Sequence, residues 1–198
     1  MVATVLSWTA VLIVAITSTS LFLNRDWRWD IGLLSIQYLG VAILVAQHWP
    51  LGMAAVKLVT GWMATATLGM TLTAFPLQKE SEERFWPQGL GFRLFMVGMI
   101  IILAIAVTPR LEESMTGIGA PVFSGTILLT GIGLLHLGTS SQISRVIFGL
   151  LTVLAGFEIL YAAVEGSILV AALLSVVNLG LGLVGAYLLN GELMEEGA

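Results

Sequence analysis

The chain has no cysteine among its 198 residues. This absence excludes thiolate metal centres, iron–sulfur clusters held by cysteine, and disulfide bonds. Charge is also scarce, because only 10% of the residues are Asp, Glu, Lys or Arg, whereas 58% are hydrophobic. A soluble domain carries about 25% charged residues. A lipid bilayer is therefore a better solvent for this chain than water.

Basic residues are too few to form a nucleic-acid surface, and the net charge is −4. We therefore expect no nucleic-acid partner. The two histidines, His48 and His136, are far apart in the sequence, and no carboxylates cluster near either. The sequence thus predicts no metal site, no cofactor and no catalytic centre of its own.

Apolar runs occupy most of the chain. A helix needs about 20 apolar residues to cross the hydrocarbon core. Runs of that size lie near residues 2–23, 30–48, 51–75, 90–108, 120–138, 143–164 and 166–189. The pattern predicts an all-α, polytopic transmembrane bundle of about seven helices. Six spans stay an alternative, because the connections after the second and sixth runs are very short.

Local signals support these boundaries. All five prolines fall at or between the ends of the runs, where a missing N–H costs least: Pro50, Pro76, Pro87, Pro109 and Pro121. The first run has no Lys or Arg before Arg25, so we interpret it as a membrane helix and not as a signal peptide.

Basic residues are unequally divided between the two sides of a seven-span bundle. Only Arg110 belongs to the side of the N-terminus. The opposite side holds Arg25, Arg28, Lys79, Arg84, Arg93 and Arg145. The positive-inside rule then predicts an outward N-terminus and an inward C-terminus, in a cytoplasmic (inner) membrane crossed several times. The long charged connection at 76–90 is either a solvated loop or a docking surface for a cytoplasmic partner.

Glu158 and Lys57 are the two charged residues well inside predicted spans. A charge near the centre of a span costs about 2.5–3.5 kcal/mol, so such residues are candidates for function. Ala155, Gly156 and Ala162 surround Glu158 on its helix and favour close packing against another helix. A desolvated carboxyl group there can take up and release protons, or it can simply hold helices together.

The two charged residues lie at matching depths. Lys57 is about six residues from the N-terminal end of its span, and Glu158 is about as far from the C-terminal end of its own. At 1.5 Å per residue, both are roughly 9 Å below the same membrane surface. We therefore predict an ion pair between them; the alternative is that Lys57 extends along its flexible stem toward the surface.

Asn178 lies near the middle of the seventh span. It forms one helical stripe with Ser175 and Gly182, at spacings of three and four residues. An amide does not exchange a proton near neutral pH, although it can hold a water molecule. We therefore interpret the stripe, including Gly182, mainly as a helix–helix contact.

The last three runs resemble a known family. Residues 147–160 contain Gly156-Phe157-Glu158-Ile159 and resemble the second helix of the NuoK subunit of respiratory complex I, which carries a Gly-Leu-Glu-Ile-like motif. The polar turn at 139–145 is similar to the turn before that helix, and residues 175–184 are similar to the third helix. The additional N-terminal runs resemble the longer HyfE-type subunits of hydrogenase-4 complexes.

This resemblance implies a membrane subunit of a complex I-related machine that lies beside antiporter-like subunits. It divides the chain into an N-terminal four-helix region, 1–119, and a NuoK-like three-helix region, 120–198. Glu158 takes the place of the first buried glutamate of the family, with Lys57 and Asn178 as further members of a proton relay. The second family glutamate is replaced by Asn178, so a path with two carboxylates is in doubt.

Two other functions stay open. The chain could be a structural subunit of another energy-converting membrane complex, in which case Glu158 is replaceable. It could also be a freestanding transporter of a small solute. A transporter predicts internal repeats and helices broken in mid-membrane, yet no repeat is evident and no proline interrupts a predicted span.

Overall fold

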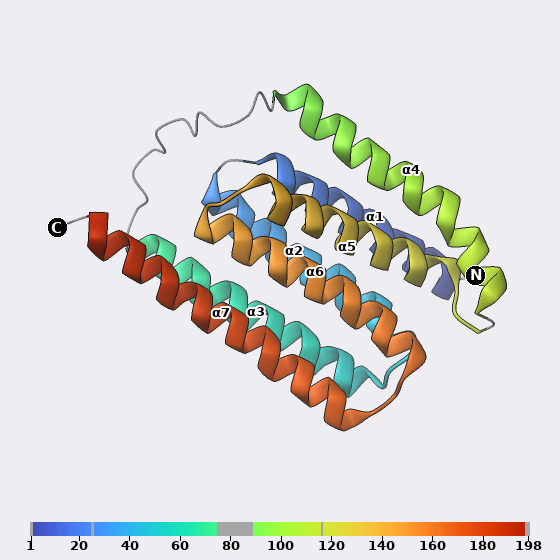
Figure 1. The fold of residues 1–198 in the computed structure, drawn as a ribbon. Coiled ribbons are helices and arrows are strands. Elements are labelled where there is room, and N and C mark those ends of the chain that lie inside the picture. The colour runs from blue at the N-terminus through green and yellow to red at the C-terminus, as the bar shows by residue number, and fades with distance from the viewer. Residues whose placement is uncertain (1, 25, 75–88, 116, 197–198) are drawn as a thin grey trace.

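The fold is a bundle of seven helices (Figure 1). The computed structural model describes residues 2–24, 26–74, 89–115 and 117–196. The helices are α1 (Val2–Leu23), α2 (Trp27–Val45), α3 (Leu51–Ala74), α4 (Leu90–Ser114), α5 (Ala120–Thr139), α6 (Ile143–Val164) and α7 (Ile168–Glu196). No strand occurs in these ranges, and all seven helices are long and apolar enough to cross a membrane. The predicted all-α class and the number of spans are confirmed. The charged residues predicted as a loop or docking surface, 76–90, lie almost wholly outside the described ranges.

The helices run alternately up and down, so the bundle has two ends (Figure 1). Helix α1 begins at the end that also holds the α2–α3, α4–α5 and α6–α7 connections; we call this the N-terminal end. Helix α7 finishes at the opposite end, beside the α1–α2 and α5–α6 connections; we call this the C-terminal end. A multi-pass membrane protein has this arrangement, while the predicted orientation relative to the cytoplasm stays a prediction.

Packing joins helices that are distant in the sequence. Helices α5 and α6 form the most extensive pair, followed by α3 with α7 and α1 with α2. Helix α2 also packs on α3 and α6, and α4 lies at the edge, against α5 and α1. The predicted regions 1–119 and 120–198 therefore pack on each other through α3 with α7 and through α1 with α5.

Several helix ends differ from those expected from hydropathy. Helix α2 ends at Val45 and not at 48, and α7 continues to Glu196 and not only to 189. Helix α2 begins at Trp27, because the Asp26 carboxylate accepts a hydrogen bond from the Arg28 N–H at 3.1 Å and caps the helix. Helix α4 continues through Pro109 to Ser114, so its expected end at residue 108 is wrong. A proline removes one N–H and does not end every membrane helix. Helix α7 begins at Ile168, two residues later than expected.

Small residues set the closest helix contacts. A Cβ atom added at Gly182 would lie 2.8 Å from the Cα atom of Ala64, so α7 and α3 approach backbone to backbone. A Cβ atom added at Gly156 would lie 2.9 Å from the backbone nitrogen of Thr130 on α5. Ala155 and Ala162 are buried on α6. All four residues expected to pack helices thus lie at helix interfaces.

Candidate functional site

An ion pair joins α3 and α6 inside the bundle. The Lys57 Nζ atom donates to Oε1 of Glu158, and the two side chains are only 2% and 1% exposed. Lys57 lies six residues after Leu51, where α3 begins, and Glu158 lies six residues before Val164, where α6 ends. The two side chains therefore meet at equal depth, as the sequence predicted. Because the Lys57 ammonium is buried, the alternative in which it extends to the surface is wrong.

A second polar contact joins α2 and α7. The Tyr38 hydroxyl donates to Oδ1 of Asn178 at 2.8 Å, and both residues are almost completely buried. Gly61 makes room for the tyrosine ring: a Cβ atom there would lie within 2.6 Å of three ring atoms. Lys57 and Gly61 are one helical turn apart on α3, so the ring lies beside the ion pair. Asn178 bridges helices, as the sequence indicated.

A third contact joins α2 and α6. Nε2 of Gln37 donates to Oγ1 of Thr152 at 3.3 Å, and the Thr152 hydroxyl donates to the Phe148 carbonyl at 2.8 Å. Together the three contacts connect α2, α3, α6 and α7. We call the residues that make them the polar cluster: Gln37, Tyr38, Lys57, Thr152, Glu158 and Asn178.

The polar cluster has hydrogen-bonding capacity left over. Among the described residues, Oε2 of Glu158, Nδ2 of Asn178 and Oε1 of Gln37 are buried without a hydrogen-bond partner. Two of these atoms accept and one donates. The ion pair can therefore hold a proton on Nζ of Lys57 or on the Glu158 carboxylate. The unpartnered atoms of Glu158, Asn178 and Gln37 can form further hydrogen bonds beside it.

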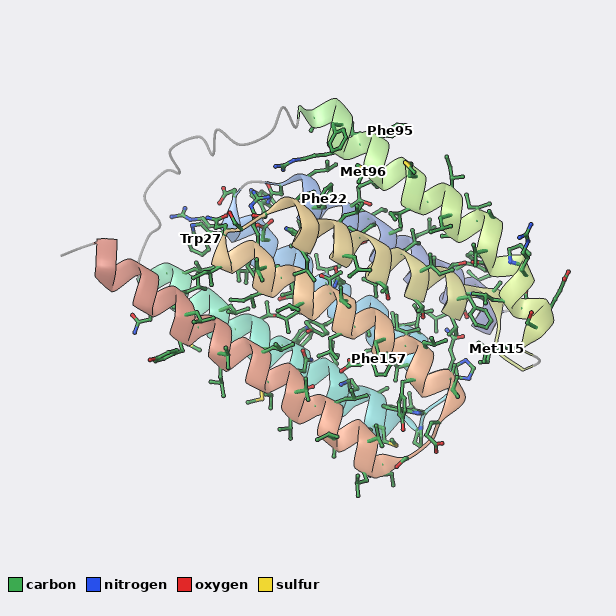
Figure 2. All side chains as sticks on the ribbon, viewed as in Figure 1. Phe22, Trp27, Phe95, Met96, Met115 and Phe157 are labelled. Atoms are coloured by element: carbon green, nitrogen blue, oxygen red, sulfur yellow. The ribbon has the colours of Figure 1, made fainter. Side chains whose placement is uncertain are left out.

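A second buried carboxylate lies at the C-terminal end of the bundle. Asp30, in the first turn of α2, is 4% exposed and accepts a hydrogen bond from Nδ2 of Asn24 at 2.9 Å. Nη2 of Arg145 on α6 donates to the Asn24 carbonyl at 3.0 Å. We call Asn24, Asp30 and Arg145 the end cluster. In the sequence, Asn24 and Asp30 lie on either side of Trp27, which is labelled with Phe22 in Figure 2.

The histidines belong to neither cluster. The buried His136 ring packs edge-on against Phe22, with ring centroids 5.7 Å apart. His48 follows α2 in the short connection to α3. Within the described ranges, no three His, Asp or Glu residues gather as a metal site would require.

Sequence reasoning found the ion pair and Asn178 but missed Gln37, Tyr38 and Thr152. Gln37 and Tyr38 are adjacent polar residues in the middle of an otherwise apolar run. Two such residues within a span favour contacts with other helices, because a lipid-facing polar group loses its hydrogen bonds. That signal was available in the sequence.

No family model, curated protein or solved structure matches the chain. The function is therefore interpreted from the geometry of the polar cluster and from the short motif around Glu158.

Proposed function

We propose that this chain is a non-catalytic integral membrane subunit of a complex I-related assembly that translocates protons, either a redox-driven or an antiporter complex. In this proposal Glu158 is the buried group that carries the proton. The Lys57–Glu158 ion pair inside the membrane spans is the observation on which the proposal depends. Each charge costs about 2.5–3.5 kcal/mol to insert, and an apolar pair would avoid that cost.

The pair has the chemistry of a proton relay. A proton that arrives on Glu158 neutralises the carboxylate and ends its attraction to the Lys57 ammonium. A proton that moves from Lys57 to Glu158 leaves both groups neutral, which a desolvated site tolerates well. Tyr38 can donate and accept hydrogen bonds, whereas Asn178 fixes the position of its hydroxyl and carries no proton.

The assembly is proposed from the resemblance around residues 156–159, and its partners would be antiporter-like membrane subunits in an inner cytoplasmic membrane. Two helices offer wide apolar faces to such partners or to lipid. Their strongly exposed residues include Phe95, Ile102 and Ile105 on α4, and Leu169, Val176 and Leu183 on α7.

A structural subunit without a proton role is the second candidate. The observation that favours it is that the same three contacts tie four helices together. A freestanding transporter is less well supported, since each described span continues without a break in mid-membrane. Pro109, inside α4, lies close to the end of that helix.

The first test is mild detergent extraction through a C-terminal tag, followed by mass spectrometry of the co-purified proteins. We expect large antiporter-like subunits in a fixed ratio to this chain. A single polypeptide or a homo-oligomer would contradict the proposal and make solute-transport assays the better experiment.

The second test replaces Glu158 with Gln in the assembled complex. We expect at least a tenfold loss of ion translocation with assembly intact, because an amide keeps the shape of the side chain but does not titrate. Glu165→Gln is the matched control: Glu165 is exposed at the end of the same helix, and we expect full activity. Full translocation by Glu158→Gln would favour the structural subunit.

A further inference from the structure

The unpartnered atoms of the polar cluster need hydrogen-bond partners. Leaving a buried polar group unsatisfied costs about 1–3 kcal/mol, and buried waters usually satisfy such groups. Oε2 of Glu158 can accept from water, and Nδ2 of Asn178 can donate to it. Both side chains are at most 1% exposed, so this water would be internal to the bundle.

The N-terminal end of the bundle is the nearer surface. Six residues of helix separate Lys57 and Glu158 from the ends of α3 and α6 there, or roughly 9 Å. Small residues stand one turn from each charge on this side: Ala54 precedes Lys57, and Ala162 follows Glu158. Both alanines are buried, and their short side chains occupy little of the space between the ion pair and the N-terminal end of the bundle.

Aromatic residues cover this end. The Trp49 ring packs edge-on against Tyr161, at 6.3 Å between centroids, and its Nε1 atom donates to the Glu165 carbonyl at 2.9 Å. Tyr161 also stacks on Phe157, which is labelled beside α6 in Figure 2. The Trp49 N–H is used by the Glu165 carbonyl, so the hydroxyl of Tyr161 is the polar group of this aromatic cover that can bond to water.

Buried apolar side chains lie between the polar cluster and the end cluster. Leu34, Leu68, Leu72 and Ile147 are at most 5% exposed. We call these four residues the apolar layer. A Cβ atom added at Gly185 of α7 would lie 2.6 Å from Cδ1 of Ile147 and 3.0 Å from Cδ2 of Leu68, so three helices close tightly there. The layer separates the polar cluster from the end cluster, and it offers water no hydrogen bonds.

We infer that the polar cluster is a water-binding pocket that opens only toward the N-terminal end, so that a proton on Glu158 exchanges with that side of the membrane. This inference deepens the proposed function, on which its proton part rests. The water pocket itself depends only on the unpartnered atoms and on the apolar layer.

Cysteine labelling tests the pocket directly, because the chain has no cysteine of its own. Thr60 and Thr65 form a matched pair on α3: Thr60 lies nine residues after Leu51, and Thr65 lies nine residues before Ala74. Both are buried, and each hydroxyl bonds to a backbone carbonyl of the same helix. Thr→Cys is a small change at either position.

The full complex is placed in vesicles of known orientation and treated from each side with a membrane-impermeant methanethiosulfonate. We expect Thr60→Cys to react at least tenfold faster from the N-terminal end than from the other, and Thr65→Cys to stay unreactive from both. Leu51→Cys, highly exposed at the N-terminal end, is the reactive control; Val59→Cys, on an exposed face of the span, is the unreactive one.

Hydroxyl-radical footprinting of the unsubstituted protein provides a measurement that no folding defect can disturb. We expect modification of the buried Tyr38 ring, beside the pocket, and none of the equally buried Phe148 ring in the C-terminal half of the bundle. Reaction of Thr65→Cys from the C-terminal end would overturn the inference. So would an unreactive Thr60→Cys together with an unmodified Tyr38.

These experiments test the water pocket and the proton-relay function separately. If Thr60→Cys reacts as expected and Glu158→Gln still translocates ions, the pocket stands and the proton-relay function fails. If Thr60→Cys and Tyr38 are both inert and Glu158→Gln is inactive, the function stands and the one-sided pocket fails.

Discussion

Two buried carboxylates in this bundle are stabilised in different ways. Asp30 lies at the C-terminal end, in the first turn of α2, where the helix N-terminus favours a negative charge. Asn24 donates to it, and Arg145 lies nearby. Glu158 lies six residues inside the C-terminal end of α6, and among the described residues its ion-pair partner is Lys57.

The comparison shows that the interactions needed to stabilise a buried carboxylate depend on its depth in the membrane. At the end of the bundle, the helix N-terminus and the bond from Asn24 share the stabilisation of Asp30. Inside the span, about 9 Å from the end of α6, a full opposite charge carries most of the stabilisation of Glu158. Loss of one partner should therefore matter much more at Glu158 than at Asp30.

Lys57→Met should have the largest effect. It leaves Glu158 buried without its cation, and breaking a buried pair from one side costs about 3–5 kcal/mol. We expect a loss of that order in the free energy of unfolding, measured by denaturant titration in mixed micelles.

The double variant Lys57→Met/Glu158→Gln provides the control for this prediction. With neither charge present, we expect it to recover at least half of the lost stability. Equal losses in the single and double variants would mean that packing of the lysine stem, and not the charge pair, stabilises α3 against α6.

Gly61→Ala should have an intermediate effect. The new methyl group would overlap the Tyr38 ring, which the bond to Asn178 holds in place. Overpacking of this kind costs about 1–3 kcal/mol. Gly32, on α2 near Asp30, has nothing within 4 Å of an added Cβ atom. Gly32→Ala should therefore change stability by no more than about 1 kcal/mol. Equal losses at the two glycines in thermal denaturation would contradict this contrast.

Asn24→Ala should have the smallest effect. It removes the hydrogen bond to Asp30 and the side-chain contacts with the Asp26 backbone, but it leaves the helix N-terminus and the Arg145 bond to the Asn24 carbonyl in place. We expect a loss of about 1 kcal/mol in the same denaturant titration. A loss as large as that of Lys57→Met would mean that the two carboxylates are stabilised alike and would remove the contrast between end and interior.

The number of helices and the ion pair could be predicted because both depend on depth, and depth follows from position along a span. Hydropathy identified all seven spans, and equal distances from the span ends brought Lys57 and Glu158 to one level. The aspartate cap of α2 and the continuation of α4 through Pro109 depend on local geometry, which hydropathy does not describe.

Lateral neighbours could not be predicted in the same way. Nothing in the pattern of apolar residues indicates that α3 packs beside α7, or that Gly61 leaves room for a tyrosine from α2. The position of a residue along its span gives the depth of its side chain in the membrane. Which side chain it contacts at that depth depends on the order of the helices around the bundle. For this reason the partners of Tyr38 and Thr152 could not be predicted, although the polar pair Gln37–Tyr38 within an apolar run marks a helix contact.

The ion pair also has a consequence for biosynthesis. Its two residues are separated by 101 positions in the chain. At about 5–20 residues per second, a ribosome needs roughly 5–20 s to make the intervening segment. During that time α3 has emerged with its lysine, while the glutamate that neutralises it has not been synthesised. Until α6 is made, the Lys57 ammonium group has to be stabilised by the interface or by the insertion machinery.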